Sequence, residues 1–236
     1  MHLLQMSNVS YKKNGRVILG NVDLTLDKGH FVGLAGINGA GKTTLMRLIV
    51  GVSKASAGQI EVAGVKAADL IKEHVSFSDG LVGFPKGTQV KNVAAFYQHL
   101  YPDFKPERYQ QLAEFLNLQS EDKVKDLSKG TRERLTIAVT LARDTDLYLL
   151  DEPFSGVDVI GRKKIIASIL DWIGDDSTIM ISSHHLEEIS EALDELVIIK
   201  DQTVFDHKTR AEMVELGNDS ANPVEQYFEH IYEGEE

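Results

Sequence analysis

The 236-residue sequence contains no cysteine, so it offers neither a disulfide framework nor thiolate chemistry. No apolar run approaches the roughly 18–20 residues of a membrane-spanning helix, and the N-terminus shows neither the charged region nor the cleavage site of a signal peptide. Acidic residues outnumber basic ones, and the formal net charge of −11 argues against a nucleic-acid binder. These absences predict a cytoplasmic protein, with a chain long enough for one large domain.

The strongest pattern that is present fits G-x-x-x-x-G-K-[ST], the P-loop, in the run Gly36-Ile37-Asn38-Gly39-Ala40-Gly41-Lys42-Thr43-Thr44. The apolar stretch 31–35 before it predicts a strand, and the spacing of apolar residues in 44–50 predicts a helix. Glycines let backbone N–H groups turn toward phosphate oxygens, and the helix N-terminus adds a favourable dipole. We therefore expect Lys42 to reach the β- and γ-phosphates of a nucleotide and the Thr43 hydroxyl to ligate Mg²⁺.

A second pattern is an apolar strand, 147–150, that ends in Asp151 and Glu152. Carboxylates placed there lie at the carboxyl edge of a parallel sheet, where α/β folds bind their ligands. Asp151 is suited to hold Mg²⁺, directly or through water, and Glu152 to orient or deprotonate an attacking water. The alternative is a strand end with two solvated acids, which the P-loop upstream disfavours.

Two further patterns stand beside predicted element ends. Ser128 and Gly130 precede a predicted helix, 132–143, so a side chain and backbone N–H groups there can donate to an anion. A simple Ser N-cap is the competing interpretation. His184 and His185 follow a buried strand, and a histidine in that place can contact a γ-phosphate. Adjacent residues of a strand point to opposite faces, which disfavours a zinc pair.

The rest of the chain predicts an α/β protein with two lobes. Residues 1–60 show the alternation of half-buried strands, and 88–145 is mainly helical. Strand–helix alternation then returns, which predicts a parallel α/β core with an antiparallel β lobe and an inserted α-helical lobe. We assign 1–216 to one domain, and 217–236 to a linker and a C-terminal helix whose aromatic stripe packs on the core.

In this order, the four patterns resemble the ATP-binding cassette (ABC) ATPases, which are P-loop NTPases, over roughly residues 3–205. The resemblance implies that Tyr11 stacks on adenine, that Asp151 is the Walker B aspartate, that Glu152 is the catalytic glutamate and that His184 senses the γ-phosphate. It makes 36–44 the Walker A loop.

The resemblance also implies that 128–131 is the signature segment, whose Ser128, Gly130 and Thr131 contact the nucleotide, and that 154–158 is the D-loop. The usual signature is Leu-Ser-Gly-Gly-Gln, and here Lys129 and Thr131 replace a glycine and the glutamine. Asp79 stands where the Q-loop glutamine is expected, and it is a further candidate ligand of Mg²⁺.

The function implied by the resemblance is that of the ATP-hydrolysing subunit of an ABC transporter, with export as the expected direction. Two ATPase subunits, identical or different, would close head to tail on ATP, and a separate membrane permease would contact the segment 79–85 and the helical lobe. The chain would then lie on the inner face of the cell membrane. Two alternatives stay open: a soluble ABC ATPase with a non-membrane partner, and a module that holds ATP without turnover, against which Glu152 and His184 argue.

Overall fold

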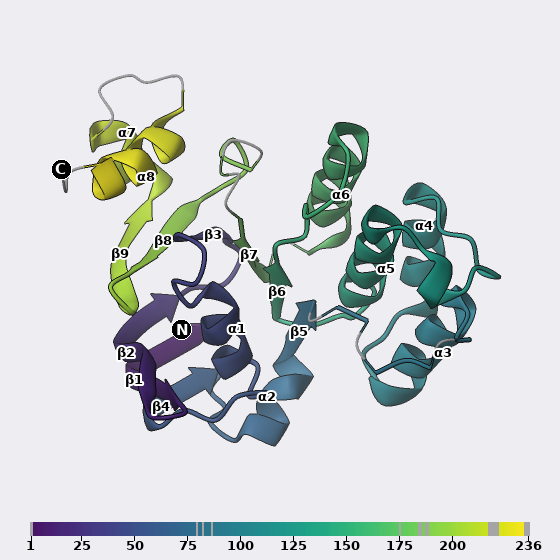
Figure 1. Ribbon diagram of the computed structural model, residues 1–236, viewed down its shortest axis with the longest axis horizontal. Helices are drawn as coiled ribbons and strands as arrows, with labels where there is room; N and C mark the ends of the chain where they lie inside the picture. Colours follow the sequence, from purple (N-terminus) through teal and green to yellow (C-terminus); the bar gives the residue numbers. More distant parts are fainter. Residues whose placement is uncertain are drawn as a thin grey trace.

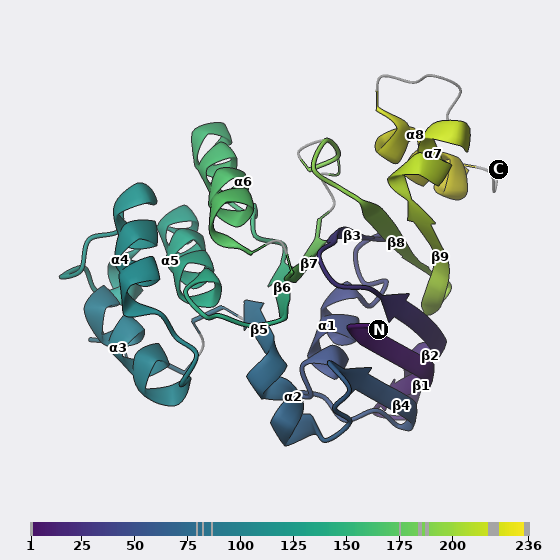
Figure 2. The ribbon, with the colours of Figure 1, turned by 180° about the vertical axis from the view of Figure 1, so that it is seen from behind.

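The computed structural model describes residues 2–78, 80–81, 83–85, 87–174, 176–183, 186, 189–216 and 222–233. Figures 1 and 2 show a small sheet and a larger sheet side by side, with a group of helices standing away from the small sheet. Among the described residues, no helix combines the length and the apolar character needed to cross a membrane.

The small sheet is antiparallel and has the strand order β2-β1-β4. Its strands are β1 (Leu4–Lys13), β2 (Arg16–Leu26) and β4 (Ala57–Val62). Asn14 and Gly15 join β1 to β2 with φ angles of 51° and 77°. Positive φ at both central residues is the geometry of a tight hairpin turn, as the Asn-Gly pair predicts.

The larger sheet has the order β5-β6-β7-β3-β8-β9, and its pairings are parallel except for β8 with β9. Its strands are β3 (Phe31–Ala35), β5 (Val75–Ser78), β6 (Leu147–Asp151), β7 (Thr178–Ser182), β8 (Glu195–Lys200) and β9 (Thr203–Thr209). All residues of β3, β7 and β8 are buried, which is typical of a parallel sheet covered on both faces.

Eight helices of four residues or more complete the described part of the chain. They are α1 (Lys42–Ile49), α2 (Ala68–His74), α3 (Val90–Leu100), α4 (Pro106–Phe115), α5 (Lys129–Leu141), α6 (Val159–Trp172), α7 (Arg210–Leu216) and α8 (Pro223–Glu233). Figure 1 shows α3, α4 and α5 grouped on the side of the large sheet opposite the small sheet. The predicted architecture, a P-loop α/β core with an antiparallel β lobe and an inserted helical lobe, is confirmed.

Two hydrophobic clusters hold the layers together, one on each face of the large sheet. The first lies between the small sheet and α1, and it includes Leu4, Val32 and Leu45. The second lies under α5 and α6 and includes Tyr148 and Ile165. Because both faces of the large sheet are packed, its strand ends are held in place, and the loops that leave them start from fixed points.

Candidate functional site

The P-loop connects the buried strand β3 to α1 and depends on glycine at two positions. Gly41 caps α1 with a φ of 115°, and a Cβ on it would lie 2.9 Å from the Leu19 side chain. A Cβ on Gly36 would lie 2.7 Å from the carbonyl oxygen of Ile199. Only glycine fits both the backbone conformation and the space, so the loop lies close against its neighbours.

The Lys42 side chain is buried and turns back into the loop. Its Nζ donates to the Gly36 carbonyl at 2.7 Å and lies 3.5 Å from that of Ile37. The same Nζ is 3.8 Å from a carboxylate oxygen of Glu152. The structure thus brings together the cation of the P-loop and the carboxylate that directly follows β6, which are 110 positions apart in the sequence.

Three hydroxyl groups fix the position of Asp151 at the end of β6. Thr43 Oγ1 donates to one carboxylate oxygen at 2.7 Å, and Ser182 Oγ donates to the other at 2.6 Å. The Asp151 N–H donates to Ser78 Oγ at 2.9 Å. A hydroxyl and a carboxylate of this kind are hard oxygen donors, which suit Mg²⁺ that also binds water and phosphate oxygens. The sequence analysis assigned no role to these two serines of β5 and β7.

Glu152 adopts a left-handed backbone conformation, with a φ of 50°. Its N–H donates to the Ser182 carbonyl at 3.1 Å and to Ser182 Oγ at 2.9 Å. Non-glycine residues in this region are strained, and such strain is held at functional sites by the surrounding structure. Ser182 therefore positions both carboxylates, since its hydroxyl also donates to Asp151.

These groups surround a cavity of about 250 Å³, lined by Ile18, Asn38, Gly39, Gly41, Lys42, Thr43, Thr44 and Glu152. Tyr11 lies on β1 and is partly buried against the small-sheet cluster, but it is not among the lining residues. Ile18 of β2 supplies an apolar wall that the sequence did not single out. The stacking of Tyr11 on adenine stays a prediction.

The segment 128–131 begins α5 and lies outside this cavity. Ser128 Oγ accepts from the Thr131 N–H at 3.1 Å and is 2.8 Å from Thr131 Oγ1, so the predicted N-cap is present. Lys129 Nζ donates to Ser155 Oγ at 2.8 Å. A Cβ on Gly130 would lie 3.0 Å from the Gly156 carbonyl. The segment thus packs on the turn after β6, while Ser128 and Lys129 stay exposed.

Comparison with known proteins identifies the family. The family described as "ABC transporter" matches residues 19–155, more than half of the chain. The Nod factor export ATP-binding protein I of Cupriavidus metallidurans is 30% identical over 243 residues, covering 94% of this chain and 79% of the relative. The chain belongs to the ABC transporter family. It is an ABC-type ATPase, as the four motifs predicted.

Solved structures share the fold of this ABC ATPase. An ATP-binding subunit of an ABC transporter superposes with a TM-score of 0.84 at 23% identity, covering 96% of this chain and 98% of the other. The dimeric ATP-binding cassette MJ0796, in a post-hydrolysis state bound to ADP and phosphate, gives 0.75 at 22% identity, covering 87% and 98%.

Two predicted site residues of the ABC ATPase, Asp79 and His184, lie outside the described residues. Their roles as a Mg²⁺ ligand and as the γ-phosphate sensor stay predictions. In the part of the chain that the structure describes, no group of three or more His, Asp or Glu side chains is arranged to hold a metal ion. A Mg²⁺ site here would rest on Thr43 and Asp151 together with phosphate and water oxygens.

Glu133, one turn into α5, carries an unusual charge environment. The pKa of its carboxyl is raised from 4.5 to about 7, mainly by burial, which Lys129 opposes and to which the nearby Asp151 carboxylate adds. The folded state therefore holds this proton more tightly than the unfolded state. The stability that this provides is fully present below about pH 4.5 and is lost as the pH rises through about 7.

We expect Glu133→Gln to weaken the pH dependence of folding in the nucleotide-free, metal-chelated protein. The wild type should lose about 1–3 kcal/mol more unfolding free energy between pH 5 and pH 8 than the variant does. Urea unfolding at both pH values measures this difference. Glu107→Gln, on the exposed start of α4, should keep the wild-type slope, and an unchanged slope in Glu133→Gln would contradict the prediction.

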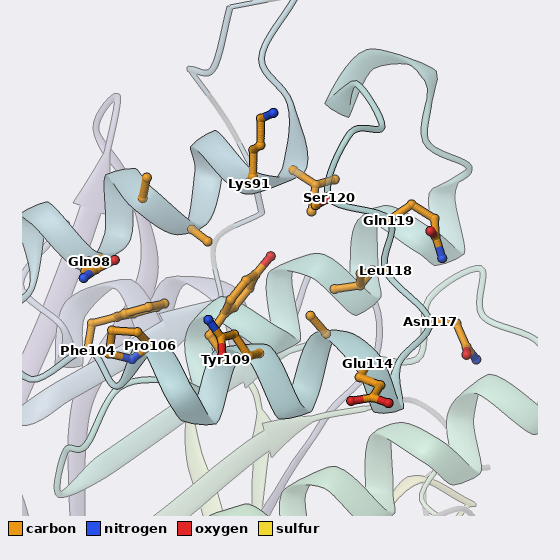
Figure 3. Close-up of a pocket in the computed structure, with 15 residues that line it drawn as sticks. Lys91, Gln98, Phe104, Pro106, Tyr109, Glu114, Asn117, Leu118, Gln119 and Ser120 are labelled. Atoms are coloured by element: carbon orange, nitrogen blue, oxygen red, sulfur yellow. The ribbon is translucent and has the colours of Figure 1, made fainter.

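The largest cavity described, of about 660 Å³, lies in the helical lobe and contains none of the motif residues. Figure 3 shows Tyr109 rising from α4 into it, with Lys91 of α3 and Leu118 on the opposite walls. Burial raises the pKa of Tyr109 to about 12. Its lining combines apolar residues, such as Phe104, with uncharged amides, such as Gln98.

Proposed function

We propose that this ABC ATPase binds and hydrolyses ATP to power a separate membrane permease, and that the transporter works as an exporter. Two ATPase subunits, identical or different, close head to tail on ATP. The assembly lies on the inner face of the cell membrane. The export direction is supported by the Nod factor export ATP-binding protein, to which the chain is similar over nearly its whole length.

The observation that carries the proposal is the separation of the two halves of the nucleotide site. The P-loop and Glu152 line one cavity, whereas 128–131, all of which the structure describes, contributes nothing to it. Ser128 and Lys129 are exposed instead, at the N-terminus of a 13-residue helix, where an anion is favoured. A second subunit would present its own segment 128–131 to this cavity, and the phosphates would join the two surfaces.

The P-loop and the two carboxylates at the end of β6 have separate roles in this reaction. Lys42 moves from the loop carbonyls to the β- and γ-phosphates, and the P-loop N–H groups bind the phosphate oxygens. Glu152 orients the water that attacks the γ-phosphate and accepts its proton. Mg²⁺, held by Thr43 and Asp151, supplies charge neutralisation on the phosphates when it is bound. Loss of the shared γ-phosphate then releases one subunit from the other.

The cavity in the helical lobe is the part of the described surface best shaped to bind the permease. It lies between α3 and α4, and Ala95 of α3 and Ala113 of α4 leave space between the two helices. Its lining contains one carboxylate, that of Glu114, and one cation, that of Lys91. Because Lys91 pairs with Glu121, Glu114 has no described ion-pair partner. Cytoplasmic loops of membrane proteins are rich in Lys and Arg, so a basic amphipathic helix of such a loop complements this groove.

Affinity purification from solubilised membranes tests the proposal. We expect the tagged wild type to retain one polytopic membrane protein, and Ala95→Arg to lose it while its ATP turnover in isolation stays unchanged. Asn92→Arg, on the exposed side of α3 outside the cavity, is the matched control and should retain the membrane protein. Retention of water-soluble partners alone would overturn the proposal in favour of a soluble ABC ATPase.

A further inference from the structure

The C-terminal helix α8 lies near the P-loop and lines two cavities with it, although it is nearly 200 positions away in the sequence. Figures 1 and 2 place α8 beside α7 and β9, on the side of the large sheet away from α3 and α4. Val224 is fully buried, and four partly buried side chains continue the apolar face along the helix: Tyr227, Phe228, Ile231 and Tyr232. The helix therefore docks on the core by an aromatic surface, as the sequence predicted.

Tyr232 holds the strand residue on which the P-loop rests. Its hydroxyl donates to the carbonyl oxygen of Ile199 at 2.8 Å. That same carbonyl lies against Gly36, at a place where a Cβ would approach to 2.7 Å. A single carbonyl of β8 is thus in contact with the first glycine of the Walker A loop on one side and with α8 on the other.

Lys200, the next residue of β8, adds a second connection to α8. Its Nζ donates to the Ile231 carbonyl at 2.9 Å, in the last turn of the helix, where a cation is favoured. The Nζ also lies 5.4 Å from the ring centroid of Tyr232 and 5.2 Å from that of Phe205. The end of α8 is therefore fixed to β8 by a buried cation as well as by the tyrosine hydroxyl.

Two cavities separate α8 from the P-loop. One, of about 340 Å³, lies between residues 37–40 and Tyr232, and the other, of about 250 Å³, lies between 36–38 and Phe228. Asn38 lines both of them and also lines the nucleotide cavity. The middle of the P-loop therefore lies between the nucleotide cavity on one side and the two cavities toward α8 on the other. The contacts that β8 and α8 make behind the loop therefore add to those of Lys42 in setting its position.

We propose that α8 is a brace for the P-loop and that Tyr232 is a positioning residue for ATP binding. By fixing the Ile199 carbonyl, Tyr232 holds Gly36 and the N–H groups that follow it in the orientation that phosphate requires. Without this contact the loop samples more conformations, and nucleotide binding must restore the order at a cost in affinity. The inference concerns nucleotide binding alone, so it does not depend on the permease or on the direction of transport.

Tyr232→Phe tests the brace because it removes only the hydroxyl and keeps the ring that packs on the core. We expect the affinity for a fluorescent ATP analogue to fall two- to tenfold, the range expected for one hydrogen bond. KM for ATP should rise by the same factor, with kcat within twofold of the wild type. Hydrogen exchange of the amides of residues 36–41 should become faster in the nucleotide-free protein.

The matched control is Tyr227→Phe on the same helix. Its hydroxyl donates to Asp206 of β9, and its side chain lines neither of the cavities behind the P-loop. This variant should bind ATP as the wild type does, with unchanged exchange at 36–41. The brace is refuted if Tyr232→Phe keeps wild-type affinity and exchange, or if Tyr227→Phe weakens ATP binding equally. Lys42→Ala, which removes the phosphate-binding cation, gives the weakest ATP binding expected in this assay and serves as its lower reference.

Discussion

Glu152→Gln is expected to lower the rate of ATP hydrolysis by about 100-fold or more while leaving ATP binding intact. A positioned general base typically contributes a factor of about 10²–10⁴. The amide keeps the size of the carboxylate but cannot accept the proton of the attacking water. The backbone should tolerate the change, because Gln202 of the same chain adopts a φ of 64°, close to the 50° of Glu152.

Phosphate release by the purified protein measures turnover, and titration with a fluorescent nucleotide measures binding. Because the variant retains ATP, size-exclusion chromatography with ATP and Mg²⁺ should show it as a dimer. Glu73→Gln, on the exposed face of α2, removes one negative charge outside the nucleotide cavity and should hydrolyse ATP at the wild-type rate. Equal turnover in wild type and Glu152→Gln would remove Glu152 from the proposed mechanism.

The sequence predicted the groups of the site that belong to local motifs. The P-loop lies within nine consecutive residues, and Asp151 and Glu152 follow a strand that its apolar run makes recognisable. Ser182 was missed because its role comes from strand pairing: the parallel register sets Asp151 beside Ser182. No local spacing encodes that pairing, so the residue that positions both carboxylates could be found only in the folded chain.

In the fold, too, the elements set by local sequence were predictable and those set by strand pairing were not. The Asn14-Gly15 hairpin and the alternating strands of the small sheet follow from turn chemistry and periodicity. The short strand β5 was not predicted, since four residues give too little periodicity, and its place at the sheet edge depends on pairing with β6. Helix α6 begins at Val159, where Asp158 caps it by accepting from the Gly161 N–H at 2.7 Å, a boundary that apolar periodicity alone does not mark.

The largest expected loss of stability comes from Arg143→Met, at the base of the helical lobe. Arg143 is buried, and its guanidinium binds both carboxylate oxygens of Asp103, the closest contact being 2.7 Å. It also donates to the carbonyls of Val75 at 2.7 Å and Lys72 at 2.9 Å, and it lies 3.9 Å from the ring centroid of Tyr101. Removing one partner of a buried ion pair typically costs about 3–5 kcal/mol.

Urea unfolding of two matched variants shows how much of the loss of unfolding free energy comes from the burial of the ion pair and how much from the unpaired charge. Lys91→Met breaks the exposed pair with Glu121, which has a similar length of 2.8 Å, and it should cost less than about 1 kcal/mol. Adding Asp103→Leu to Arg143→Met should restore part of the loss, because the uncompensated carboxylate is then gone. If Arg143→Met costs no more than Lys91→Met, the guanidinium does not hold the lobe to the core.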